Sequence, residues 1–209
     1  MTRSRSLKTR WALPFSALSL ALVVGLSGCG DQKELLARPV PRNMCDTVGA
    51  ALLNKLAPGG PAYDSVGDIT DDRKTIACEL ETSEPDPERN REPVYLMFEV
   101  SRFGGSEDHK PYENADEWLE RLESKAEKKT PKQAKVSFDE LDGYTGFVWA
   151  ADFGPDKRPE LEYAVRKDDT ILHITYKPVS GIPAATAEKW ILDAGEQVLA
   201  RFNDVQYGL

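Results

Sequence analysis

The feature that most limits how this chain can fold is a period-two alternation of apolar and polar residues in its C-terminal half. Four segments with this period are paired around two-residue turn signals, a strong one at Asp142-Gly143 and a weaker one at Asp168-Asp169. The segments are 134–141 and 144–153 around the first turn, and 160–167 and 170–177 around the second. Strands joined by two-residue turns run antiparallel, so the pattern predicts a mainly antiparallel sheet.

Three other segments place apolar residues at helical spacing, and two more are typical of strands. The expected helices cover residues 43–56, 114–128 and 184–203, and the additional strands cover 73–82 and 94–103. Asn43 is a suitable N-cap for the first helix, and Asn114 with Glu117 resembles a capping box for the second. The sequence therefore predicts a single α+β domain over residues 43–209, with about three amphipathic helices flanking the sheet.

The first 28 residues have the layout of an export signal. Residues 1–10 carry four basic residues and no acid, and residues 11–28 carry no charge. This is typical of a secretory signal peptide. The rival interpretation is a transmembrane helix, which needs about 20 mainly apolar residues.

The end of the apolar run favours the signal peptide, because Leu26-Ser27-Gly28-Cys29 resembles a bacterial lipobox. The resemblance implies cleavage between Gly28 and Cys29 and attachment of acyl chains such as palmitate to Cys29. Two acyl chains suffice for stable anchoring, which would hold the protein at the extracytoplasmic face of the cell membrane. An ordinary signal peptide followed by an incidental cysteine is the alternative. Residues 29–42 would then be the lipidated cysteine and a proline-bearing tether.

Cys45 and Cys78 remain once Cys29 carries lipid. Two leftover cysteines of one domain in an oxidising compartment are expected to form a disulfide. A metal site and a redox pair are the alternatives, but the two cysteines lack C-x-x-C spacing and have no histidine close in sequence.

The lipobox, the tether and the spacing of Cys45 and Cys78 together resemble a family of short lipoproteins of high-GC Gram-positive bacteria that carry an uncharacterised domain. The expected order of helices and strands is similar to the Mog1/PsbP-like fold, an antiparallel sheet flanked by helices. The resemblance implies a cell-envelope lipoprotein and this fold, and it implies no active site. The sequence departs from the family pattern at Met44, where proline is common, and at Glu79, where an aromatic residue is common.

The net charge of the chain without its first 28 residues argues against nucleic acid as a partner. Removal of the first 28 residues lowers the formal net charge from −8 to −12, whereas nucleic-acid binding needs a basic face. We therefore expect no nucleic-acid partner, and attachment to the membrane through the acyl chains on Cys29.

The chain contains none of the common catalytic or cofactor motifs, so no cofactor and no catalytic residue is predicted. His173 lies in the middle of a predicted strand, where a hydrogen-bonded histidine is more common than a catalytic one. His109, beside Glu107 and Asp108, is a weak candidate for a metal ligand, and residues 68–74 are more typical of an acidic turn than of a calcium loop. No metal site is expected.

Three functions stay open. The first is a non-enzymatic binding or accessory module of the cell envelope, with an unknown protein, glycan or lipid partner. The second is a carrier of a lipid or another apolar ligand, which could use the aromatic row Phe147, Trp149 and Phe153, although core packing of Trp149 is the more common role. The third and least favoured is an envelope hydrolase with carboxylates drawn from Asp139, Glu140, Asp142 and Asp152.

Overall fold

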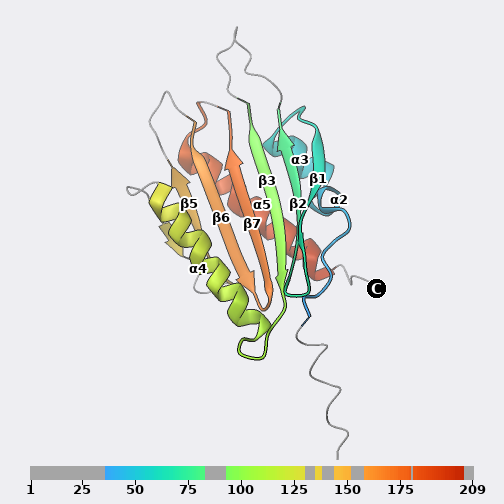
Figure 1. Ribbon diagram of the computed structural model, residues 1–209. Coiled ribbons are helices and arrows are strands. Elements are labelled where there is room, and N and C mark those ends of the chain that lie inside the picture. The colour runs from blue at the N-terminus through green and yellow to red at the C-terminus, as the bar shows by residue number, and fades with distance from the viewer. Residues whose placement is uncertain are drawn as a thin grey trace, which may run out of the picture.

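The computed structural model describes residues 36–82, 93–129, 135–137, 144–151, 158–179 and 181–204. Within these ranges the chain forms an antiparallel sheet in the strand order β1-β2-β3-β7-β6-β5-β4, together with four helices (Figure 1). In chain order the elements are α2 (Met44–Val48), α3 (Ala50–Leu56), β1 (Ala62–Ile69), β2 (Arg73–Glu81), β3 (Tyr95–Phe103), α4 (Pro111–Lys129), β4 (Lys135–Ser137), β5 (Thr145–Ala151), β6 (Glu160–Lys167), β7 (Thr170–Lys177) and α5 (Ala184–Asp204).

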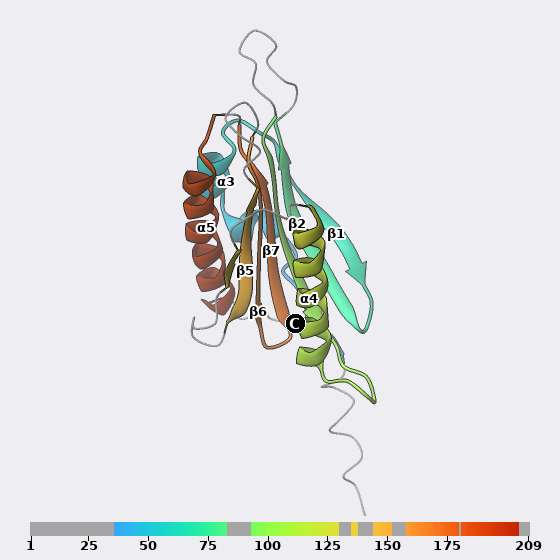
Figure 2. The same ribbon diagram turned by 90° about the vertical axis from the view of Figure 1, so that its left-hand side faces the viewer.

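The helices lie on both faces of the sheet. Figure 2 shows α3 and α5 on one face and α4 on the other. The prediction of an α+β domain with a mainly antiparallel sheet is confirmed, and the described strand pairs are all antiparallel. Among the described residues, no helix is both long and apolar enough to cross a membrane.

The strands of both predicted hairpins pair with each other, but the β4–β5 register, with Lys135 opposite Trp149, is one residue away from the register that a two-residue turn at Asp142-Gly143 would give. Strands β6 and β7 pair around Asp168 and Asp169, and Asp168 adopts the positive φ of 52° that a tight turn can require. Strands β4 and β5 pair from Lys135 opposite Trp149. The expected turn at Asp142-Gly143 lies outside the described residues.

Strand β1 is an element that the sequence pattern does not predict. Seven of its eight residues are exposed, because it is an edge strand with both faces open to solvent over most of its length. Alternation of apolar and polar residues signals one buried face. A strand without such a face gives no signal, so the sequence predicts only a turn at residues 68–74.

Two helix boundaries also differ from expectation. The first predicted helix is divided into α2 and α3 at Gly49, whose φ is 87°, while the Asn43 side chain caps α2 by accepting a hydrogen bond from the Asp46 amide at 2.9 Å. Helix α4 begins at Pro111, a favoured first helical residue. The expected capping box at Asn114 is therefore wrong, and the Glu113 carboxylate accepts a hydrogen bond from the Lys110 amide instead, at 2.7 Å.

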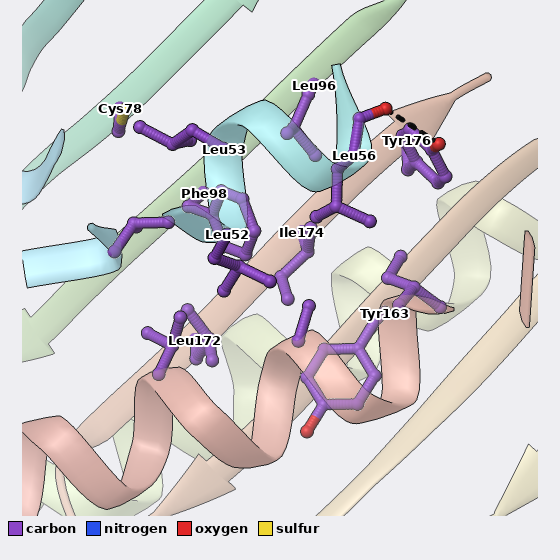
Figure 3. Packing of buried hydrophobic residues seen from close by; sticks show 14 of the residues in the cluster. Leu52, Leu53, Leu56, Cys78, Leu96, Phe98, Tyr163, Leu172, Ile174 and Tyr176 are labelled. Atoms are coloured by element: carbon purple, nitrogen blue, oxygen red, sulfur yellow. Dashed lines mark hydrogen bonds between the residues drawn. The ribbon is translucent and has the colours of Figure 1, made fainter. Parts of the chain in front are cut away.

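The main core fills the space between the sheet and the layer of α2, α3 and α5 (Figure 3). Leucines of α3 point toward β3 and β7, where Phe98 and Ile174 are fully buried. The Tyr176 hydroxyl donates a hydrogen bond to the Leu56 carbonyl at 3.0 Å, which fixes the end of α3 to β7. Packing of the α3 leucines on the sheet and one buried hydrogen bond thus set the position of this helix.

The expected disulfide between Cys45 and Cys78 is present. It joins α2 to β2, with Cα atoms 4.8 Å apart and Cys78 completely buried. The bond closes a loop with a sequence separation of 33. In the chain-entropy account, closing such a loop stabilises the fold by roughly 3–4 kcal/mol.

The segment 37–41, which we call the strap, lies against one end of the sheet. The Arg38 guanidinium binds both carboxylate oxygens of Asp169 in the β6–β7 turn. The Lys74 ammonium, at the start of β2, donates to the Ala37 carbonyl at 2.8 Å. The last part of the expected tether is therefore attached to the domain.

Candidate ligand-binding groove

Helix α4 lies obliquely across the sheet and contacts β3, β5, β6 and β7 (Figure 1). Its apolar stripe is the predicted one, and it packs on aromatic and aliphatic side chains of the sheet. The stripe consists of Ala115, Trp118, Leu119, Leu122 and Ala126. Because the helix is oblique, its C-terminal half diverges from β3 and leaves a groove of about 360 Å³ between helix and sheet.

The floor of the groove is a set of polar side chains from β6 and β7. The His173 Nε2 atom lies 2.7 Å from a carboxylate oxygen of Glu162, and the Thr175 hydroxyl donates to the same oxygen at 3.1 Å. The side chains of His173 and Glu162 are each only 13 % exposed. This is a largely buried polar network whose carboxylate is held by two neighbours, so its geometry is fixed before any ligand arrives.

A second charged pair lies beside this network. The Lys177 ammonium is 3.1 Å from a carboxylate oxygen of Glu160. On the other side, Glu99 of β3 lies 4.0 Å from the Nδ1 atom of His173. The rim of the groove on α4 carries Lys125. Acidic and basic side chains thus alternate around the groove. Glu160 lies beside Lys177, and Glu162 lies beside His173.

Apolar and aromatic atoms supply the walls. Met97 and Tyr95 come from β3, and the Tyr95 hydroxyl contacts the Met97 sulfur at 3.7 Å. Leu122 and Ala126 come from α4. Burial, and then the charge of Glu79, raise the pKa of Tyr95 above its ordinary value, so its hydroxyl stays protonated and can donate a hydrogen bond at neutral pH.

Polar side chains continue from the groove toward the edge of the sheet. The Tyr63 hydroxyl donates to Glu79 at 3.3 Å, and Ser65 donates to the same carboxylate. The charge of Glu79 is the largest cause of the raised pKa of Tyr63. In Figure 1 no helix lies in front of β1 and β2 on this side of the sheet.

A second cleft, of about 500 Å³, lies at the N-terminal end of α4. Its main feature is Arg73, whose guanidinium carbon lies 4.2 Å from the centre of the Trp118 ring and which also pairs with Asp68. The Arg73 guanidinium is held by Trp118 and Asp68, so we interpret this arginine as a residue that stabilises the fold. It joins β2 to α4.

The weak metal candidates do not form a site. His109 lies 3.9 Å from Glu117 of α4, and Asp68 pairs with Arg73. No group of three or more potential ligand side chains within the described ranges is arranged to hold a metal ion.

The other predicted site residues divide into two groups. Phe147 and Trp149 are buried beneath α4, so Trp149 has the core-packing role that is the more common one for such a residue. The rest lie outside the described residues. They are Leu26, Ser27, Gly28, Cys29, Asp139, Glu140, Asp142, Asp152 and Phe153.

His173 stands out in the sequence by its place in the middle of a predicted strand. The other members of its network, Glu162 and Thr175, do not stand out. Glu162 and Thr175 are directly opposite each other across the β6–β7 hairpin. A two-residue turn at Asp168-Asp169 dictates this register, so the pairing of Glu162 with Thr175 could have been found from the predicted hairpin. The approach of Glu99 could not, because β3 and β7 are distant in sequence.

Comparison of the chain with protein-family models, with curated proteins and with solved structures gives no match in any of the three. The groove is therefore interpreted from its own geometry and chemistry.

Proposed function

We propose that this protein is a membrane-anchored extracytoplasmic lipoprotein whose domain is a non-enzymatic binding or accessory module of the bacterial cell envelope. In this proposal the acyl chains on Cys29 hold the protein at the membrane, and the groove beside α4 holds its ligand. The observation that carries the binding role is the largely buried network of Glu162, His173 and Thr175 at the floor of a groove. Concave sites with a few fixed polar groups are typical of ligand sites.

The resemblance to the lipobox supports the anchored location, and the disulfide is consistent with an oxidising compartment. The resemblance to lipoproteins of high-GC Gram-positive bacteria and to the Mog1/PsbP-like fold belongs to the same proposal. An antiparallel sheet with helices on both faces is consistent with it.

The charged groove favours a polar ligand over an apolar one. An acyl chain in this groove would bury Glu160, Glu162 and Lys177 against hydrocarbon, and burying charged groups without new partners is costly. The aromatic row expected to hold an apolar ligand is already covered, since Phe147 and Trp149 pack against α4. A lipid carrier is therefore the less supported alternative, and a hydrolase gains no support from the described residues.

Two measurements test the proposal. For the anchor, wild-type protein should remain with the membrane fraction and carry acyl chains by mass spectrometry, whereas Cys29→Ala should be unprocessed or released. Cys29→Ala that is processed and retained like the wild type would contradict lipidation.

For the groove, the full-length protein is purified from the membranes of its own bacterium and its bound small molecules are identified by native mass spectrometry. We expect a bound polar molecule that is lost from Glu162→Gln and kept by Glu188→Gln, which lies on α5 at the opposite face of the sheet. Equal retention by both variants would show that the groove is not the site.

A further inference from the structure

Strand β1 leaves one edge of the sheet open. It is the terminal strand of the sheet, and no strand in the described part of the chain pairs with its outer edge (Figure 1). Alternate N–H and C=O groups of an antiparallel edge strand point away from its neighbour, where a further strand can pair with them. The ladder between β1 and β2 is regular over residues 62–66 and shifts register before Ile69. Residues 62–66 are therefore the part of β1 on which a partner strand can pair.

The side chains of β1 do little to protect this edge. Natural edge strands are often protected by lysine, by proline or by a covering element, and β1 contains neither residue. Tyr63, Val66 and Ile69 are instead 51 %, 66 % and 58 % exposed, and they are three of the five exposed large apolar side chains among the described residues. Tyr63 lies opposite Glu79 and Val66 opposite Ile76, so apolar atoms are exposed on both faces of the strand. A strand added at this edge would cover apolar side chains on both faces.

The hairpin of β1 and β2 is strongly acidic. Residues 62–81 contain six acids and two bases, which gives this segment a formal net charge of −4. Both bases are engaged within the protein, since Arg73 pairs with Asp68 and the Lys74 ammonium donates to the strap. The acids are Asp64, Asp68, Asp71, Asp72, Glu79 and Glu81.

The neighbouring elements do not offset this charge. Helix α2 carries Asp46 and no base, and β3 carries one acid and one base. Arg38 of the strap is bound to Asp169, and Arg42, between the strap and α2, adds one exposed base. The hairpin therefore attracts a basic strand, whereas a second copy of this chain would bring its own excess of acids against it.

We propose that β1 is a docking strand for an extended, basic segment of a partner protein, which adds to the sheet by pairing with residues 62–66. Main-chain hydrogen bonds hold such a segment, and its side chains give the specificity. Lysine and arginine side chains of the segment meet the acids of the hairpin, and its apolar side chains cover Tyr63 and Val66. This surface lies outside the groove, whose described lining comes from α4, β3, β6 and β7, so the inference does not depend on the ligand of the groove.

The test uses three synthetic peptides of the length of β1. In the first, lysine alternates with valine and tyrosine. In the second, glutamate replaces lysine, and the third is the basic peptide with a proline at its centre. Each is titrated into the full-length protein in nanodiscs of zwitterionic phosphatidylcholine, with empty nanodiscs as the blank.

Binding is measured by calorimetry, and amide hydrogen exchange is followed residue by residue by mass spectrometry. We expect only the basic peptide without proline to bind and to slow exchange in residues 62–66. The proline removes an N–H donor from the added strand. The binding should weaken as salt is raised, because salt screens the attraction between the peptide and the exposed acids.

Two pairs of variants assign the binding to β1. Val66→Lys places a lysine on the edge strand, and Tyr112→Lys places one at an exposed apolar position of α4. Glu81→Lys reverses one exposed charge of the hairpin, and Glu120→Lys makes the same change on the exposed side of α4. We expect Val66→Lys to weaken binding about tenfold and Glu81→Lys about threefold, with both α4 variants close to the wild type. Thermal unfolding checks that each variant is folded.

The other outcomes would overturn the proposal. They are absence of binding by the basic peptide, equally tight binding of the acidic peptide, and binding that leaves exchange in residues 62–66 unchanged. Slow exchange at every residue of this stretch in the free protein would show that its edge is already covered, by a second copy if light scattering gives a dimer. None of these results bears on the anchor or the groove, which are tested separately by Cys29→Ala and Glu162→Gln.

Discussion

The hydroxyl of Tyr176 on β7 donates a hydrogen bond to the carbonyl of Leu56, 120 positions earlier in the chain, at 3.0 Å. The carbonyl belongs to the last residue of α3, where helix carbonyls lack partners within the helix. One buried phenol thus satisfies a helix end and fixes the position of that helix on the sheet. Burial raises the pKa of Tyr176 to about 12.

This pKa predicts a loss of stability in alkali. The folded state keeps the Tyr176 phenol protonated, while the unfolded chain releases the proton near pH 10. The stabilising contribution is therefore complete below about pH 10 and is lost as the pH rises from 10 to about 12. Tyr176→Phe should cost about 1 kcal/mol at neutral pH through the lost hydrogen bond and should flatten the decline above pH 10. Urea unfolding at pH 8, 10 and 11 measures both effects, and an unchanged slope in the variant would contradict the assignment.

The disulfide predicts a large difference between the oxidised and the reduced protein. Replacing both Cys45 and Cys78 by alanine should lower the free energy of unfolding by roughly 3–4 kcal/mol, because the unfolded chain regains the freedom of the closed loop. Reduction of the wild type should have a similar effect. Denaturant unfolding with and without reductant gives the comparison, and mass spectrometry of non-reduced digests should detect the Cys45–Cys78 peptide pair. Free thiols at both positions in protein prepared without reductant would refute the bond.

Two glycines provide a matched test of the break between α2 and α3. Gly49 and Gly59 have φ values of 87° and 78°, so alanine at either position should cost about 1–2 kcal/mol in backbone strain. A Cβ atom at Gly49 would also lie 2.5 Å from the Nη1 atom of Arg201, whereas nothing lies within 4 Å at Gly59. We therefore expect Gly49→Ala to be more destabilising than Gly59→Ala in thermal unfolding. Equal costs would show that Arg201 moves aside freely.

The contact between the strap and Asp169 predicts a loss of stability when Arg38 is replaced. Asp169 is buried, and Arg38 supplies two charged hydrogen bonds to it. Arg38→Ala should destabilise the protein by about 1–3 kcal/mol, because it leaves the carboxylate without these bonds. Arg42→Ala, which removes an exposed arginine close to the strap, should cost less. If the double variant Arg38→Ala with Asp169→Asn is no more stable than Arg38→Ala, the unpaired charge is not the cause of the loss.

The parts of this fold that could be predicted from the sequence are those with one buried face and local pairing. The stripe of α4 has strong periodicity because one side of the helix meets the core. The β6–β7 hairpin keeps a period of two because one face lies in the main core, while its other face is only partly covered, by α4 at Ala164 and Ile171. Strand β1 has no buried face, so its residues carry no such pattern. The division at Gly49 depends on a backbone conformation that a glycine permits but does not signal by itself.

The groove could be predicted only in part. The hairpin register brings Glu162 next to Thr175, but the approach of α4 and β3 to this pair depends on tertiary packing. No local pattern in the sequence reports the oblique path of α4. The groove results from that path, so it could not be predicted from the sequence.

The position of the disulfide has a mechanical consequence for a protein held by its N-terminus. On an anchor at Cys29, tension between the membrane and a bound ligand would enter the domain first at the strap, where Arg38 and Lys74 hold it to the end of the sheet. Beyond the strap, Cys45 would pass the load covalently to Cys78 in β2, inside the sheet. Strand β1 lies within the loop that this bond closes, so the force would bypass it. The edge strand β1, seven of whose eight residues are exposed, would therefore not be peeled away by a pull on such an anchor.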